Sequence, residues 1–210
     1  MSPSKYRLRK VFRRPILAVA RPLASTNVSP NAITYLAVLV SLTAFLSLNL
    51  NGFQWLYGIL VFLVGFLDGV DGAVARLEDR ASTEGAFIDS VSDKLSEFII
   101  LLAIALAYPC KDLFSLYVPL WVLLCTASWL MTSYTRSRAE GLGVKDLDVG
   151  LGARSERLMI LVIFSVLGLL LYGLIAVTLV GILTAAYRFY HYSAILETTS
   201  SAEDKSISTG

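Results

Sequence analysis

Long uncharged stretches alternate with short charged segments along the chain. Residues 22–67 and 158–187 contain no charged side chain, and Lys111 and Asp112 are the only charged residues in 99–134. A membrane-spanning helix needs about 20 predominantly apolar residues. Each of these stretches is therefore long enough to hold one or more spans, and the pattern predicts an all-α integral membrane protein.

Turn residues and charges divide these stretches into six predicted transmembrane helices. They are Ile33–Leu50, Gln54–Arg76, Gly85 to the residue before Pro109, Leu113–Tyr134, and two helices that share Leu158–Leu196. The Asn51-Gly52 pair predicts a tight turn between the first two. The last two helices are expected to separate near Gly173, although 30 uncharged residues at about 1.5 Å each would also allow one long tilted helix.

The N-terminal segment is expected to form an amphipathic helix on the membrane surface within residues 1–24. Its basic residues are Lys5, Arg7, Arg9, Lys10, Arg13, Arg14 and Arg21. Its apolar residues share one helical stripe and are Phe12, Ile16, Val19, Ala20 and Leu23. Pro15 and Pro22 are expected to break this helix. The alternative is a basic tail that only sets the orientation of the chain.

The distribution of basic residues predicts the orientation. If the N-terminus is cytoplasmic, the external loops contain only Lys111 among the Lys and Arg residues. Six spans with both termini in the cytoplasm follow. Residues 1–197 are then one membrane domain, and the small, polar segment 198–210 is expected to be disordered. Neither the net charge of +2 nor the two cysteines indicate a nucleic-acid partner, a disulfide framework or a cysteine metal site.

Four aspartates interrupt the second and third predicted spans. Asp68 and Asp71 are three residues apart, and Asp89 and Asp93 are four apart, so each pair lies on one helical face. The short connection at 77–84 predicts that the two helices are antiparallel neighbours and that the four carboxylates converge at one depth. An active site on the cytoplasmic side is therefore expected.

Divalent cations would relieve the repulsion among four carboxylates in a low-dielectric environment. Oxygen ligands favour Mg²⁺ or Mn²⁺, and four of them suit a pair of ions of the kind used for displacement at phosphorus. Gly69, Gly72 and Gly85 would let a phosphate approach the backbone, and Arg76 could clamp a diphosphate. Two alternatives stand. The acids could pair with internal basic residues such as Lys94 and Arg76, and Gly65 and Gly69 could serve close helix packing.

The run from Asp68 to Asp93 resembles the signature of the CDP-alcohol phosphatidyltransferases, D-x2-D-G-x2-A-R-x8-G-x3-D-x3-D, at every fixed position. The family transfers a phosphatidyl-type group from a CDP-linked lipid to an alcohol and releases CMP. The resemblance implies metal binding by Asp68, Asp71, Asp89 and Asp93, with Asp93 also as the general base. It implies a CDP site made of Asp68, Gly72, Ala75, Arg76 and Gly85, and it implies a homodimer.

Arginines in the other cytoplasmic segments indicate an anionic acceptor. These segments resemble the family branch that makes phosphatidylinositol phosphate or archaetidylinositol phosphate, in which Arg136, Arg154 and Arg188 would bind the phosphate of inositol 1-phosphate. The alternatives are that the arginines obey the positive-inside rule and pair with Glu140 and Glu156, or that the acceptor is glycerol 3-phosphate.

The residues alone also leave open two functions of other classes. A divalent-cation transporter would also carry intramembrane acids, but its acids should lie near the bilayer midplane within two related halves. A catalytically silent membrane scaffold is the other, and the complete set of acids argues against it.

Overall fold

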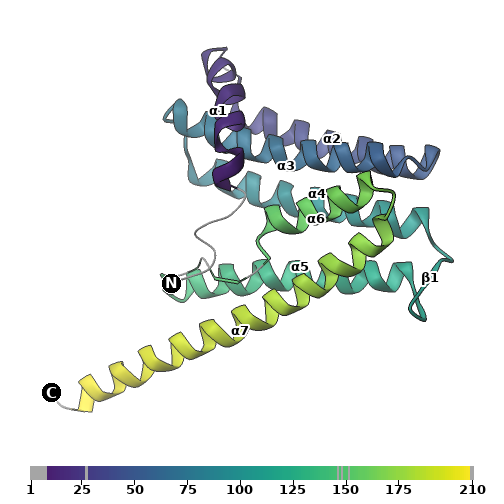
Figure 1. Ribbon diagram of the computed structural model, residues 1–210. Coiled ribbons are helices and arrows are strands. Elements are labelled where there is room, and N and C mark those ends of the chain that lie inside the picture. Colours follow the sequence, from purple (N-terminus) through teal and green to yellow (C-terminus); the bar gives the residue numbers. More distant parts are fainter. Residues whose placement is uncertain (1–8, 27, 146, 148, 151, 209–210) are drawn as a thin grey trace.

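The computed structural model describes residues 9–26, 28–145, 147, 149–150 and 152–208. Within these residues the chain forms seven helices and one short hairpin (Figure 1). The helices are α1 (Arg9–Ser25), α2 (Pro30–Asn51), α3 (Gln54–Leu77), α4 (Thr83–Ala107), α5 (Val118–Gly141), α6 (Arg154–Val166) and α7 (Leu170–Ser208). The antiparallel strands β1 (Asp112–Leu113) and β2 (Leu116–Tyr117) join α4 to α5.

Helices α2 to α7 pack as a closed ring in the order α2, α3, α6, α7, α5, α4. All six contribute to one buried apolar core, represented by Leu48, Val61, Ile100, Trp129 and Leu161, with Leu174 completing it from α7. The closed ring brings together helices that are distant in the sequence, such as α3 and α6. Burial of this core from every side stabilises the arrangement.

Polar side chains add interhelical bonds to this core. The Tyr57 hydroxyl of α3 donates to the Ile100 carbonyl of α4 over 2.8 Å, and the Asn49 amide of α2 donates to the Ala103 carbonyl over 3.1 Å. Such bonds stabilise helix pairs where water is scarce. They lie toward the end of the ring opposite the acidic residues.

Local capping signals are present at both ends of α2 and at the start of α4. The Ser29 hydroxyl accepts from the Ala32 N–H at the start of α2, and the Ser82 hydroxyl accepts from the Gly85 N–H at the start of α4. Gly52 adopts a left-handed φ of 67° after α2, so the predicted turn at Asn51-Gly52 is confirmed.

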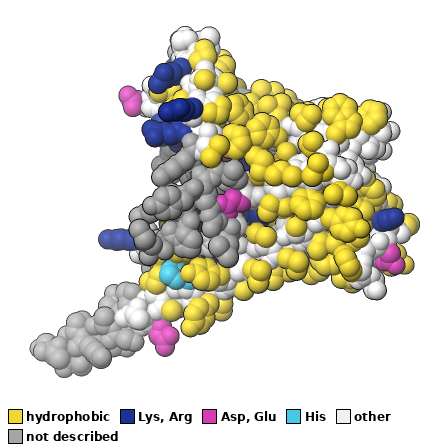
Figure 2. Space-filling view, viewed as in Figure 1, with side chains coloured by type: hydrophobic (Ala, Val, Ile, Leu, Met, Phe, Trp, Pro, Cys, Tyr) yellow, Lys and Arg dark blue, Asp and Glu magenta, His cyan; other side chains and the backbone are white. Residues whose placement is uncertain are grey.

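The outer surface of the ring is apolar. Figure 2 shows hydrophobic side chains over most of the visible middle of the molecule, with most visible charges toward its two ends. Among the described residues, three helices are long and apolar enough to cross a membrane by themselves: Pro30–Asn51, Gln54–Leu77 and Leu170–Thr198. An exposed apolar surface of this extent is typical of a membrane protein.

Helix α1 lies across one end of the ring at a steep angle to α2 and α3 (Figure 1). It packs against α3 through Ile16, Ala20 and Leu23, and the rings of Phe12 and Phe62 are 5.7 Å apart. The expected break at the prolines is wrong, because α1 continues through both Pro15 and Pro22. Val19 is exposed rather than part of the packed stripe. The predicted basic residues Lys5 and Arg7 lie outside the described residues.

Two predicted helix boundaries are corrected. The fourth long helix begins at Val118 rather than Leu113, because Phe114 and Ser115 form a left-handed turn between β1 and β2. The last two helices separate around Gly168, whose φ is 73°, and not near Gly173, which lies inside α7. The two helices are therefore separate, which excludes a single long helix.

The segment from Thr198 to Ser208 continues α7 and is helical instead of disordered. Neither Gly nor Pro, the two residues that most disfavour a helix, occurs between Gly181 and Ser208.

Candidate active site

Helices α3 and α4 do not pack along their lengths, which corrects the expectation that they are neighbours. Helix α2 packs on both of them on one side, and α6 packs on α3 on the other. The C-terminal end of α3 and the N-terminal ends of α2, α4 and α6 meet at the same end of the ring (Figure 1). A polar site forms here between α3 and α4.

Three of the four predicted aspartates meet in this site. Carboxylate oxygens of Asp68, Asp71 and Asp89 all lie within 4.8 Å of one another. Asp71 is buried, and its Oδ2 accepts a hydrogen bond from the Thr34 hydroxyl of α2 over 2.6 Å. Its Oδ1 accepts from the Gly72 N–H over 2.6 Å. These two bonds fix the carboxylate of Asp71 toward the other acids.

The three carboxylates fit a divalent cation. Oxygens that share a Mg²⁺ or Mn²⁺ ion lie about 2.1 Å from it, so a small closure of the cluster would bring them into its coordination sphere. Asp89 Oδ1 is buried without a hydrogen-bond partner, as expected for a ligand atom that needs a cation. The site is therefore a candidate metal centre.

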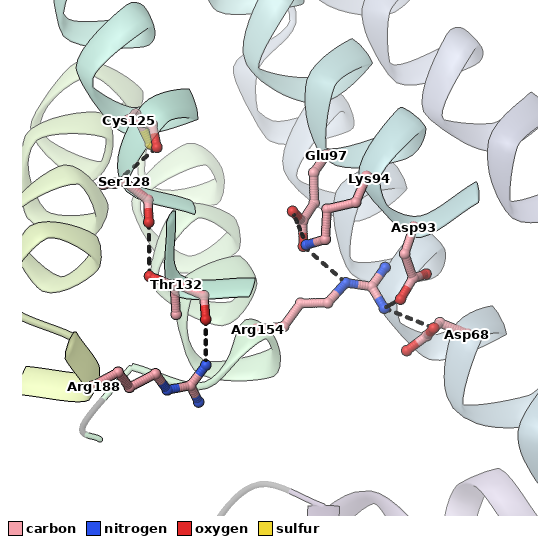
Figure 3. A network of polar contacts seen from close by, with 9 residues as sticks. All are labelled: Asp68, Asp93, Lys94, Glu97, Cys125, Ser128, Thr132, Arg154 and Arg188. Atoms are coloured by element: carbon pink, nitrogen blue, oxygen red, sulfur yellow. Dashed lines mark hydrogen bonds and ion pairs between the residues drawn. The ribbon is translucent and has the colours of Figure 1, made fainter. Parts of the chain in front are cut away.

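Asp93 lies outside the cluster of three and shares Arg154 with Asp68. Arg154 is the first residue of α6, and its Nη1 lies 2.7 Å from Asp68 Oδ1 and also contacts Asp93 Oδ2 (Figure 3). A cation at a helix N-terminus is disfavoured by the helix dipole. The two aspartates offset this cost, so α6 begins with a guanidinium held between α3 and α4.

Glu97 extends this network one turn along α4. Its Oε1 lies 3.1 Å from Arg154 Nε, and its Oε2 accepts a hydrogen bond from the Lys94 ammonium over 2.6 Å. The alternative that the motif acids pair with an internal basic residue holds for Asp68 and Asp93, but the partner is Arg154 and not Lys94. Lys94 pairs with Glu97, and Arg154 pairs with Asp68 and Asp93.

The residues predicted to bind CDP lie around the C-terminal end of α3 and the start of α4. A Cβ atom at Gly72 would be 3.3 Å from Arg76 Nη1, so the Arg76 guanidinium lies directly over this glycine. Gly85 is close to Asn31 of α2, whose Oδ1 would be 3.7 Å from a Cβ there. Ala75 is half-buried, and Arg76 is exposed.

Of the three predicted acceptor arginines, Arg154 contacts the motif carboxylates. Arg188 of α7 is buried, and its Nε and Nη1 donate to the carbonyls of Val149 and Thr132 over 2.9 and 2.8 Å. Figure 3 shows it beneath Thr132, while the Arg154 side chain extends toward Asp93 and Asp68. Arg136 is an exposed residue of α5.

Sequence reasoning missed Thr34 and Glu97. Thr34 carries no charge and lies 37 residues before its partner Asp71, so nothing local indicates the contact. Glu97 was detectable in principle, because it continues the spacing of four from Asp89 through Asp93 on one helical face.

Comparisons with known proteins give a match over most of the chain. The CDP-alcohol phosphatidyltransferase family model matches residues 27–192. Archaetidylinositol phosphate synthase of Pyrococcus horikoshii is 33% identical over 193 residues, which is 91% of this chain and 97% of that protein. Phosphatidylinositol phosphate synthase of Cutibacterium acnes is 30% identical over 157 residues, 72% of each chain.

Solved structures share the fold. The crystal structure of Mycobacterium tuberculosis phosphatidylinositol phosphate synthase with CDP-DAG bound has a TM-score of 0.72 and 23% identity, covering 85% of this chain and 94% of that one. The same enzyme in complex with manganese and citrate also has a TM-score of 0.72, with 22% identity, over 84% of this chain and 88% of that one. With the complete motif at a carboxylate cluster and a family match over most of its length, this chain belongs to the CDP-alcohol phosphatidyltransferase family.

Proposed function

We propose that this protein transfers the phosphatidyl-type group of a CDP-linked lipid to inositol 1-phosphate and releases CMP. One observation carries the proposal: the Arg154 guanidinium contacts Asp68 and Asp93 at the carboxylate cluster. A donor diphosphate at the cluster would then lie beside a cation suited to an acceptor phosphate. The relatives named for inositol phosphate products support the same acceptor.

The four aspartates would hold two Mg²⁺ or Mn²⁺ ions, with Asp68, Asp71 and Asp89 as the central ligands and Asp93 completing the set. Bound metal would neutralise the diphosphate and stabilise the charge that develops as CMP leaves. Gly72, Ala75 and Gly85 line the approach to the cluster, and Arg76 pairs with the diphosphate of the CDP group.

Asp93 is the general base of the reaction. The acceptor hydroxyl attacks the phosphorus that bears the lipid, its proton passes to Asp93, and the phosphorus–oxygen bond to CMP breaks. Arg154 binds the acceptor phosphate, and Arg136 and Arg188 complete the anion site from α5 and α7. Diacylglycerol-type and archaeol-type donors have the same reacting groups, so both fit this scheme.

In the membrane, helices α2 to α7 are six spans with both termini and the site on the cytoplasmic side, and α1 lies in the interface. This arrangement places the basic residues of α1 on the cytoplasmic face, as the positive-inside rule requires. The lipid tails of the donor enter from the bilayer. The assembly is a homodimer, as in the family.

CMP release from a CDP-linked lipid tests the proposal. Purified protein is incubated with Mn²⁺ or Mg²⁺ and, in parallel, with inositol 1-phosphate, glycerol 3-phosphate, serine or free inositol. We expect CMP release that requires metal and is fastest with inositol 1-phosphate. Faster release with glycerol 3-phosphate would change the acceptor, and faster release with serine or inositol would refute the role of the arginines. Metal uptake into vesicles without CDP-lipid would instead support a transporter.

A further inference from the structure

Glu97 is a buried carboxylate outside the motif. Its side chain is 5% exposed, and it lies in α4 one turn beyond Asp93, farther from the end of the ring at which the motif acids meet. An ionised carboxylate in such a place is costly unless cations neutralise it. The charged groups around Glu97 therefore indicate its role.

Two cations flank Glu97, one on each oxygen. Oε2 accepts the 2.6 Å hydrogen bond from Lys94, and Oε1 is 3.1 Å from Arg154 Nε. Neither Oε1 nor Arg154 Nε makes a hydrogen bond, so their contact is an electrostatic one. Lys94 holds one side of the carboxylate in place, and the other side faces the guanidinium.

Arg154 is therefore held at two positions of one planar group. Nη1 contacts Asp68 and Asp93, and Nε faces Glu97 (Figure 3). Because the guanidinium is flat, contacts at Nε and Nη1 define its plane and the direction of its remaining amino group. Without Glu97, the attraction of the guanidinium to Asp68 and Asp93 would be unopposed. The guanidinium could then turn farther toward these two carboxylates.

We propose that Glu97 is a positioning residue that, with Lys94, restrains the Arg154 guanidinium at the edge of the carboxylate cluster. This restraint keeps Arg154 oriented for an acceptor phosphate and limits its competition with divalent metal for Asp68 and Asp93. The part that concerns the acceptor rests on the proposed function. The part that concerns metal does not.

Titration of Mn²⁺ into the purified protein, followed by calorimetry, tests the restraint without any substrate. Glu97→Gln is compared with Arg154→Gln, with the double variant and with Glu84→Gln, an exposed carboxylate of the same helix. We expect the Mn²⁺ Kd to rise about tenfold in Glu97→Gln, the size of one lost charged contact. The rise should vanish when Arg154 is also replaced, and Glu84→Gln should match the wild type.

Comparison of the double variant with the single variants distinguishes a positioning role of Glu97 from an effect on folding. If Glu97→Gln weakens Mn²⁺ binding equally with and without Arg154, or leaves it unchanged, the proposal is wrong. Glu97→Asp, which keeps the charge, should recover most of the affinity. Thermal unfolding of each variant identifies any that fails to fold. If Glu97→Gln does not fold, Glu97→Asp replaces it in the double-variant comparison, and a smaller rise in the Mn²⁺ Kd is expected.

Steady-state kinetics test the acceptor part. In Glu97→Gln the KM for inositol 1-phosphate should rise about tenfold, while the KM for the CDP-lipid should change less than about twofold. An unchanged acceptor KM would refute this part. If the wild type does not use inositol 1-phosphate, the proposed function fails, and the metal titration still decides whether Glu97 positions Arg154.

Discussion

At the scale of single residues, Arg154 determines how the acids of the site are arranged. It is neutralised by Asp68 and Asp93 at Nη1 and faces Glu97 at Nε, although these residues come from two different helices. A half-buried cation among several carboxylates relieves the repulsion between them. The site therefore contains an internal cation beside the carboxylates that are proposed to hold metal.

Asp89 is the most direct test of the metal centre, because its Oδ1 is buried without a hydrogen-bond partner. Asp89→Asn keeps the shape and removes the charge. We expect CMP release to fall by about a hundredfold or more, and Mn²⁺ binding by calorimetry to weaken in parallel.

Asp79→Asn is the matched control for this variant. Asp79 is exposed in the loop after α3 and has a φ of 53°, a conformation that Asn also tolerates. The Asp79→Asn variant should retain normal metal binding and activity. Full activity in Asp89→Asn would show that the cluster is not the catalytic centre.

At the scale of elements, α1 docks onto α3 next to the site. Gly69 lies between the motif residues Asp68 and Asp71, and a Cβ atom there would be 2.6 Å from Ile16 Cδ1. At Gly65, a Cβ atom would meet Leu158 Cδ1 at 3.5 Å, an ordinary contact. The two glycines of the small-residue pair therefore have different roles, and Gly69 serves the close approach of α1.

Alanine substitutions separate these roles. Gly69→Ala should lower the thermal midpoint of the purified protein, because the added methyl group displaces Ile16. Gly65→Ala should be neutral or should stabilise by up to about 1 kcal/mol through its higher helix propensity. Both changes are measured by thermal unfolding in the same detergent.

Ile16→Val removes the atom that Gly69→Ala would contact. The double variant Gly69→Ala/Ile16→Val should therefore recover most of the loss seen in Gly69→Ala, after correction for Ile16→Val alone. If the double variant showed only the sum of the two single effects, α1 would not be docked on Gly69 as described.

At the scale of the whole molecule, the closed ring places the loop between α4 and β1 at the end opposite the carboxylate site (Figure 1). Cys110 lies in this loop and is exposed, whereas Cys125 is buried in the core. Cys110 can therefore report the orientation of the protein in the membrane, and Cys125 serves as an internal control.

A thiol reagent that does not cross membranes tests the orientation. We expect it to label Cys110 in intact cells from the outside and to leave Cys125 unmodified. Ala81→Cys in a Cys110→Ser background, in the loop between α3 and α4, should be labelled only in inverted vesicles. The opposite pattern would place the site outside the cell and would contradict the proposed orientation.

The sequence by itself determined the apolar helices, the polar face that carries Asp68, Asp71, Asp89 and Asp93, and the family. These features are local, because a helix repeats every 3.6 residues and a motif has fixed spacing. Gly168 shows the limit of this reasoning, since its left-handed conformation, rather than the presence of a glycine, marks the break after α6.

Only the tertiary structure decided which partners these side chains have. Thr34 contacts Asp71 across 37 residues, and Arg154 contacts Asp93 across 61. Helix α2 packs against both α3 and α4, and α6 brings Arg154 between them. Such contacts depend on the order of helices around the ring, which side-chain periodicity does not encode, because many packings bury the same apolar faces.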